Sequence, residues 1–129
     1  MERVTMVGAI FFRARDPEGL RRWYADNLGF TEDSPAVPAW QPGLGQTLCP
    51  FPEDTDYFGR RDQAWMINYR VRDLDAMLAQ LRAAGARVDE RVEDYDYGRF
   101  GWATDPEGNR FELWQPVPES TSGPRTVSN

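Results

Sequence analysis

The residue types that could do chemistry in this chain are restricted, because the sequence contains no histidine. Its absence removes Ser–His and Cys–His nucleophilic pairs, histidine general bases and histidine metal ligands together. The only cysteine, Cys49, has no activating neighbour in the sequence and is expected to be an ordinary buried thiol. Acid–base or metal chemistry must therefore rest on carboxylates, amides, this one thiol and water.

Glu112 is a carboxylate that falls within a predicted strand. It lies in a stretch rich in β-formers, residues 110–114, where successive side chains point to opposite faces of a strand. Arg110 and Trp114 then share the face of Glu112. Apolar surroundings would raise the pKa of such a carboxyl, which suits a general acid or base. A salt bridge to Arg13, Arg70 or Arg110 is the alternative role for the same residue.

The elements that must position Glu112 follow from apolar patterning and from turn residues. Asp16 and Asp73 each precede a run of apolar residues at helical spacing, and both are suited to cap a helix. Gly29 and Gly85 follow those runs as stop signals. The predicted helices span 17–28 and 73–84. The predicted strands span 4–14, 39–41, 46–49, 64–71, 87–93, 97–104 and 110–114, with a loop at 50–62.

The two halves of the chain repeat the same order of elements. When Asp16 is set on Asp73, an offset of 57 residues, Ile10 falls on Ile67 and Phe12 on Tyr69. The repeat predicts one domain over residues 1–116, with modules at about 4–52 and 64–116. Residues 117–129 have little to bury and are predicted to be a disordered tail.

Composition supports a single folded domain, with 129 residues, 40% hydrophobic and 28% charged. A net charge of −6 makes nucleic acid an unfavourable partner. No apolar run approaches the length of a membrane span, so no membrane partner is expected. The single cysteine and the absence of a signal-type N-terminus lead us to expect a cytoplasmic protein.

Three groups of residues resemble the vicinal oxygen chelate superfamily, which includes glyoxalases, bleomycin-resistance proteins and extradiol dioxygenases. Trp23-Tyr24 followed by Leu28-Gly29-Phe30 is similar to the first helix of that family and its exit. The run at 105–114 (DPEGNRFELW), preceded by 97–100 (YGRF), looks like its closing hairpin. The resemblance covers residues 4–116. It implies an α+β fold of two βαβββ modules whose mixed sheets curl around a cleft, and it makes a homodimer the expected assembly.

The resemblance also implies where a metal would bind. Members with a metal place one ligand on the first strand and one on the last strand of each module, the first-strand ligand standing seven residues before the helix-opening Asp. These positions fall on Ala9 and Met66, on Glu112, and, with a register set by aligning 46–48 with 110–112, on Leu48. Only Glu112 is a usual ligand, so a divalent metal is disfavoured and no cofactor is expected.

The same strand phase predicts which side chains line the cleft. It predicts an apolar floor with a few polar groups, a composition typical of a small-molecule pocket. The predicted ligand-binding residues are Phe11, Arg13, Met66, Asn68, Arg70, Arg110 and Trp114, with Glu112 as the candidate catalytic residue. Three tryptophans could stack on a planar ligand or form core or dimer contacts: Trp40, Trp65 and Trp102. Tyr57 and Phe58 lie in the proline-bounded loop and could form a lid or a dimer contact.

Two main functions remain open from the sequence. The first is a small-molecule-binding protein without the usual metal, such as a drug-sequestering protein of the bleomycin-resistance type, for which an acidic chain and a cationic ligand would be compatible. The second is a glyoxalase- or dioxygenase-like lyase, isomerase or oxygenase that uses Glu112 as a base or metal anchor. A dimeric interaction module without a ligand is a weaker third alternative.

Overall fold

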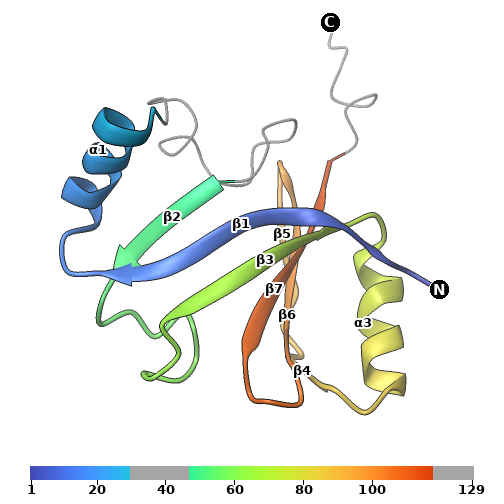
Figure 1. Ribbon diagram of the computed structural model, residues 1–129. Helices are drawn as coiled ribbons and strands as arrows, with labels where there is room; N and C mark the ends of the chain where they lie inside the picture. Colours follow the sequence, from blue (N-terminus) through green and yellow to red (C-terminus); the bar gives the residue numbers. More distant parts are fainter. Residues whose placement is uncertain (30–46, 118–129) are drawn as a thin grey trace, which may run out of the picture.

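The computed structural model describes residues 1–29 and 47–117, which form an α+β fold. A mixed sheet contains seven strands, in the order β2-β1-β3-β7-β6-β4, with β5 paired to β6. The strands are β1 (Val4–Ala14), β2 (Thr47–Pro52), β3 (Trp65–Val71), β4 (Arg87–Val88), β5 (Glu93–Tyr95), β6 (Gly98–Thr104) and β7 (Arg110–Pro116). The helices are α1 (Pro17–Leu28) and α3 (Leu74–Ala83), and they lie at opposite ends of the curled sheet (Figure 1). The predicted α+β fold is thereby confirmed.

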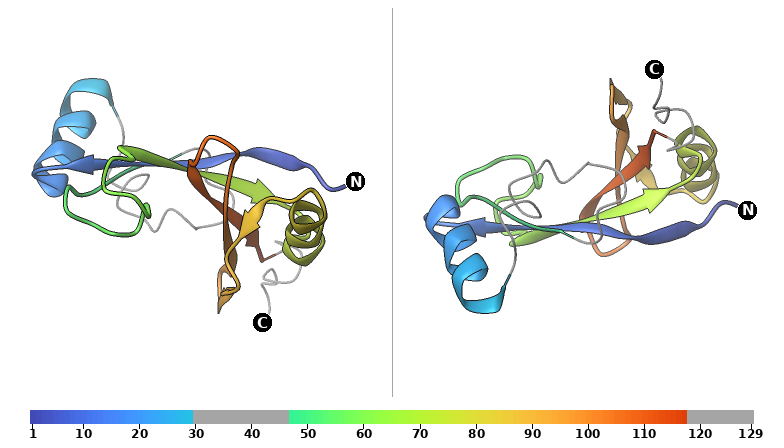
Figure 2. Two further views of the ribbon diagram at one scale, coloured as in Figure 1. Left: turned by 90° about the horizontal axis from the view of Figure 1, so that it is seen from below. Right: turned by 90° about the horizontal axis from the view of Figure 1, so that it is seen from above.

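The two modules join within one chain. Strand β1 pairs antiparallel with β3, with Ile10 opposite Ile67. Each first strand also pairs in parallel with the last strand of its own module, β1 with β2 and β3 with β7. The sheet is therefore continuous from the first module to the second, and the two views of Figure 2 show β1 running the full length between the helices. The strand predicted at 39–41 lies outside the described residues, as does most of the predicted tail.

Both helices begin where the repeat predicts. Asp16 accepts a hydrogen bond from Gly19 N at 3.0 Å, and Asp73 accepts one from Ala76 N at 3.0 Å. These contacts satisfy backbone donors that the first turn of a helix leaves free. Because the two caps are equivalent, the offset of 57 residues relates the two modules in the structure as well as in the sequence.

Helix α3 covers one face of the sheet. Its residues Leu74, Met77 and Leu78 are buried against Val71 and Leu113. Tyr69 and Phe111 are partly buried in the same cluster, so these positions of β3 and β7 lie on the helix side of the sheet. The other face of β3 and β7 points away from α3 and toward the rest of the core, because successive side chains of a strand alternate between the two faces.

The structure corrects two predicted boundaries. Strand β2 continues through Pro52, three residues into the predicted loop, because a strand at the edge of a sheet tolerates proline. The strand predicted at 87–93 is divided into β4 and β5. The division follows Asp89. The backbone N of Asp89 still donates to Trp102 O at 2.9 Å, as in a strand, but its carboxylate accepts a hydrogen bond from Arg110 Nη1 at 2.8 Å.

The helices that the structure describes are too short to span a bilayer.

Candidate functional site

Glu112 is the centre of the candidate site. Its side chain is fully buried on β7, and its carboxylate accepts three hydrogen bonds. Asn68 Nδ2 donates to Oε1 at 2.6 Å, and Trp102 Nε1 donates to Oε2 at 3.1 Å. The hydroxyl of Tyr57 donates to the same Oε2 through a short contact. The carboxylate is thus held from three sides by protein groups.

Strand register explains two of these partners. Asn68 of β3 lies beside Glu112 in the parallel pair, and Trp102 of β6 lies directly opposite it in the antiparallel pair. Side chains at paired positions emerge on the same face of a sheet, so both reach the carboxylate from neighbouring strands. The predicted phase placed Asn68 on the Glu112 face, and this placement is confirmed.

The third partner comes from the loop that joins β2 to β3. The ring of Tyr57 lies parallel to that of Phe51, with centroids 5.5 Å apart and 3° between the planes. It also meets Trp102 edge to face at 6.3 Å. Its neighbour Phe58 is fully buried and belongs to the core. Tyr57 and Phe58 were predicted to form a lid or a dimer contact; of the two, Tyr57 is the one that donates a hydrogen bond to Glu112.

Arg13 holds this loop in place. Its guanidinium donates to four backbone oxygens of the loop: Glu53 O at 2.8 Å, Thr55 O at 2.7 Å, Arg60 O at 3.0 Å and Gln63 O at 2.9 Å. It also lies over the ring of Phe58, 4.9 Å from the centroid. A guanidinium has five N–H donors in a rigid planar arrangement, which suits this role. Arg13 was predicted to bind ligand, and in the structure it also anchors the loop that carries Tyr57.

Apolar side chains form the walls around Glu112. Ala9, Phe11, Met66 and Phe58 make one fully buried cluster, against which Cys49, Phe51 and Tyr57 pack. Phe11 and Met66 were predicted on this face of the sheet, and they lie there. Water is excluded from the carboxylate by these groups, so its charged form loses solvation.

Burial changes the acidity of the site. It raises the pKa of Glu112 to about 7, although the hydrogen bonds from Tyr57, Asn68 and Trp102 and the charge of Arg110 act in the opposite direction. Burial and the adjacent carboxylate raise the pKa of Tyr57. At neutral pH Tyr57 is therefore the proton donor of this pair, and Glu112 stands close to the midpoint of its own titration.

The predicted salt bridge to Glu112 is not formed by any of the three arginines. Arg110 pairs with Asp89 at 2.8 Å and lies 5.6 Å from the ring centroid of Trp102. Arg70 lies 4.9 Å over the ring of Trp114. The described ion pairs leave Glu112 out, because neutral donors already occupy its oxygens.

Trp114 and Trp102 belong to the core rather than to an open surface. Both are almost completely buried, and Trp114 stacks on Phe100 at 6.1 Å and 5°. Trp65 is 47% exposed on β3 and is the one of the three discussed tryptophans that faces outward among the described residues. Trp40 lies outside them. Trp102 acts here as a hydrogen-bond donor, a role that the sequence did not indicate.

Gly8 makes room for Asn68. A Cβ atom at Gly8 would lie 2.4 Å from Asn68 Oδ1, well inside van der Waals contact. Asn68 is fully buried, and its Oδ1 atom has no hydrogen-bond partner while Nδ2 binds Glu112. The amide is therefore held between the backbone of β1 and the carboxylate of β7.

The register of the first module corrects one predicted position. Phe11 pairs with Cys49, just as Asn68 pairs with Glu112, and Phe11 and Asn68 are related by the offset of 57 residues. The structural counterpart of Glu112 is thus Cys49, one residue beyond the predicted Leu48. The alignment of 46–48 with 110–112 failed because it relied on three residues without a shared turn to fix their register. Burial raises the pKa of the Cys49 thiol to about 12.

These positions do not fit the metal that the superfamily resemblance implies. Ala9 offers no donor atom, Met66 offers a thioether, and Cys49 carries a thiol that stays protonated at neutral pH. Glu112 is the one carboxylate among the four, and its oxygens already accept three protein hydrogen bonds. No cluster of three or more acidic or cysteine side chains suited to a metal occurs within residues 1–29 and 47–117.

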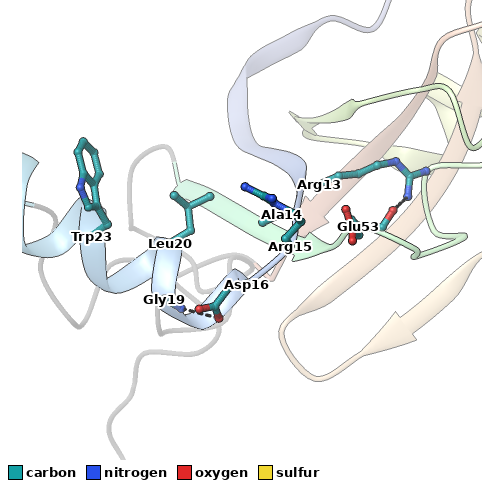
Figure 3. Close-up of a pocket in the computed structure, with 8 residues that line it drawn as sticks. All are labelled: Arg13, Ala14, Arg15, Asp16, Gly19, Leu20, Trp23 and Glu53. Carbon is teal, nitrogen blue, oxygen red and sulfur yellow. Dashed lines mark hydrogen bonds between the residues drawn. The ribbon is translucent and has the colours of Figure 1, made fainter.

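A separate groove lies at the other end of the sheet. It has a volume of about 1000 Å³ between the end of β1 and the start of α1, and Figure 3 shows Leu20 and Trp23 on one side with Arg13 and Glu53 on the other. Trp23 is 52% exposed. The groove is open to solvent and does not include Glu112, so we place the candidate chemistry at the buried carboxylate.

Comparisons with known proteins agree with this architecture. The profile of the Glyoxalase-like domain family matches residues 9–114, and the chain belongs to that family. Neighbours of known structure include members of the glyoxalase/bleomycin resistance/dioxygenase superfamily, one of them from Vibrio splendidus 12B01. A comparison with curated proteins found no match.

Enzymes of two kinds are among the solved structures that share the fold. Methylmalonyl-CoA epimerase from Mycobacterium tuberculosis is 22% identical with a TM-score of 0.64, and the match covers 93% of each chain. A variant of the Streptomyces coelicolor epimerase, in complex with 2-nitronate-propionyl-CoA, is 18% identical with a TM-score of 0.66, covering 90% of this chain and 100% of that chain. A Mn(II)-bound glyoxalase from Novosphingobium aromaticivorans is 18% identical with a TM-score of 0.60, covering 89% of this chain and 40% of that chain.

Proposed function

We propose that this member of the glyoxalase-like family binds a small molecule over Glu112 and does so without the metal of its relatives. The observation that carries the proposal is the buried carboxylate itself, with three protein donors on its oxygens and apolar side chains around it. A buried carboxylate is costly to maintain, and such groups concentrate at functional sites. Because Glu112 is fully buried, a ligand reaches it when the side chain of Tyr57 moves aside.

Sequestration of a drug-like molecule is the form of this function that we favour. The net charge of −6 favours the approach of a cationic compound, and a single ionisable carboxylate in an apolar wall supplies one specific polar contact. Binding of this kind needs neither a metal nor a reactive group. The three N–H and O–H groups that donate to Glu112 support this function, because they suit a hydrogen-bonded pocket better than a metal coordination site.

A ligand screen tests this proposal. Small aromatic and cationic compounds would be added to the wild-type chain and to Glu112→Gln, and the shift of the melting temperature would be measured. We expect compounds that stabilise the wild-type chain and stabilise Glu112→Gln less. The matched control is Glu107→Gln, which removes an exposed carboxylate in the turn between β6 and β7. Equal stabilisation of all three proteins would contradict a role for Glu112.

Proton transfer by Glu112 is the second candidate function. A pKa of about 7 is the value at which one carboxyl can both accept and donate a proton at neutral pH. An isomerase or lyase acting on a small carbonyl compound would use that property. Exchange of the α-proton of such a compound with deuterated water, followed by proton NMR, would reveal the activity. Loss of exchange in Glu112→Gln would assign it, and exchange that survives the substitution would exclude Glu112 as the base.

We further propose that the chain forms a homodimer in the cytoplasm. Several large apolar side chains are exposed in the single chain, among them Trp65 at 47% and Trp23 at 52%. Exposed aromatic side chains of this size are enriched at protein interfaces. Light scattering of the purified chain would give twice the 14.8 kDa mass for a dimer, and a mass of one chain would exclude it.

A further inference from the structure

The side chain of Tyr57 occupies the candidate site in the manner of a bound aromatic ligand. Its ring lies parallel to Phe51, approaches Phe11 at 6.2 Å and meets the edge of Trp102. Its hydroxyl donates to Glu112 at the inner end. A flat ring between aromatic walls, with one polar atom on a buried carboxylate, is the arrangement by which pockets hold planar ligands.

The surrounding loop is anchored without help from the phenol. Arg13 binds loop oxygens on both sides of Tyr57, from Glu53 and Thr55 to Arg60 and Gln63. Phe58 is fully buried next to it in the chain. The backbone of Tyr57 itself has weaker ties, with its N donating to Thr55 Oγ1 at 3.2 Å and its O accepting from Arg110 Nε at 3.3 Å. The side chain can therefore leave while most of the loop anchors remain.

The chemistry of Glu112 restricts what can replace the phenol. Asn68 Nδ2 and Trp102 Nε1 are pure donors, and they fix the carboxylate as the acceptor. When Glu112 is ionised, an incoming carbonyl, carboxylate or phosphate would present only lone pairs to this acceptor and would be repelled. A group that carries N–H or O–H would renew the contact that Tyr57 gives up.

We infer that Tyr57 is an exchangeable occupant of the site and that the ligand is a planar aromatic molecule presenting an O–H or N–H to Glu112. The inference rests on the proposed function and specifies its ligand class. Phe51 then stacks on the ligand ring and Trp102 meets that ring edge to face, as both residues now do with the ring of Tyr57. Release of the ligand returns the phenol to the carboxylate, so the empty site is never exposed to water.

Paired probes test the donor requirement. p-Cresol reproduces the side chain of Tyr57, and toluene has the same ring and methyl group without the hydroxyl. Isothermal titration of Tyr57→Ala with each probe should give p-cresol affinity about tenfold or more above that of toluene, as expected for one hydrogen bond to a charged group. The wild-type chain should bind p-cresol at least about tenfold more weakly than Tyr57→Ala does, because its own phenol competes.

The control variant is Tyr95→Ala, which removes an exposed tyrosine that stacks on Tyr97 away from Glu112. It should bind both probes as the wild-type chain does. Equal affinity of Tyr57→Ala for toluene and p-cresol would overturn the donor requirement and leave the proposed small-molecule site intact. Failure of a folded Tyr57→Ala to bind either probe would overturn both.

A spectroscopic measurement covers the case in which Tyr57→Ala does not fold. The indole N–H of Trp102 points at the Tyr57–Glu112 contact, with 3.3 Å between Trp102 Nε1 and the phenol oxygen. Its resonance in the wild-type chain should shift saturably on addition of p-cresol and should not shift with toluene. An unchanged resonance, or equal shifts with both probes, would overturn the inference.

Discussion

Tyr57 and Trp102 donate to the same oxygen of Glu112, Oε2, although they stand 45 residues apart in the sequence. One donor comes from a loop and the other from a strand that pairs with the strand of Glu112. Asn68 donates a hydrogen bond to the second oxygen of Glu112, Oε1. The loop between β2 and β3 is therefore part of the candidate site and completes the hydrogen-bonding environment of Glu112.

Substitution Tyr57→Phe should raise the pKa of Glu112 further, because the hydroxyl that stabilises the charged carboxylate is lost while burial is retained. We expect a loss of stability of about 1–3 kcal/mol at pH 8, where Glu112 is ionised and loses a charged hydrogen bond. Carbon-13 NMR of the glutamate carboxyl groups would follow the titration. A pKa that falls or stays constant in the variant would contradict the hydrogen bond. Tyr95→Phe is the control.

The titration of Glu112 should appear in the pH dependence of stability. Burial raises its pKa from 4.5 to about 7, so the folded chain holds more protons than the unfolded chain between these values. The contribution of Glu112 to the free energy of unfolding is therefore greatest below about pH 4.5 and falls as the pH rises through 7. The fall amounts to about 3 kcal/mol.

Glu112→Gln removes that titration and leaves all others in place. Urea unfolding of both proteins between pH 4 and 8 should show the wild-type chain losing stability relative to the variant as the pH rises, by roughly the amount above. A difference that stays constant across this range would show that Glu112 titrates normally. The quantity to compare is the difference in free energy of unfolding between the two proteins, because the contributions of the other titrating groups cancel in it.

Gly8→Ala should destabilise the fold through Asn68. The added Cβ would come within 2.4 Å of Asn68 Oδ1, and the amide cannot move away without breaking its bond to Glu112. We expect a cost of about 1–3 kcal/mol in chemical denaturation. Gly85→Ala is a useful contrast, since nothing lies within 4 Å of its Cβ and its cost comes only from the backbone angle φ of +87°. In the double variant Gly8→Ala, Asn68→Ala most of the steric cost should disappear, and persistence of the full cost would place the clash elsewhere.

Cys49 should react slowly with thiol reagents in the folded chain. Burial raises its pKa to about 12, so little thiolate is present at pH 8. Mass spectrometry after treatment with iodoacetamide should show mainly unmodified protein, and addition of denaturant should make the labelling fast. Rapid labelling of the folded chain at pH 8 would show that the thiol is exposed or activated.

The sequence predicted the parts of the site that depend on strand alternation. Phe11, Met66, Asn68, Glu112 and Trp114 were assigned to one face of their strands, and all five are buried there. Their positions follow from a period of two residues, which local patterning reveals. The helix starts at Asp16 and Asp73 were predictable for a similar reason, since a cap depends on a few adjacent residues.

The remaining parts depend on contacts between distant segments. Nothing near Tyr57 in the sequence indicates that its hydroxyl reaches Glu112, 55 residues away. The strand phase predicted that Arg13 lines the cleft, but it did not indicate that the guanidinium donates to four backbone oxygens of the loop. The counterpart of Glu112 was placed on Leu48 rather than Cys49, since strand register is set by pairing partners that the local sequence does not show.

Metal binding by the wild-type chain tests the central claim most directly. The chain would be purified without chelator, its metal content determined, and its melting temperature measured with Mn²⁺, Co²⁺, Ni²⁺ and Zn²⁺ beside an EDTA control. Because Tyr57, Asn68 and Trp102 already occupy the oxygens of Glu112, we predict no stoichiometric metal and no saturable shift. Near-stoichiometric metal, or a saturable shift that disappears in Glu112→Gln, would contradict a metal-independent site.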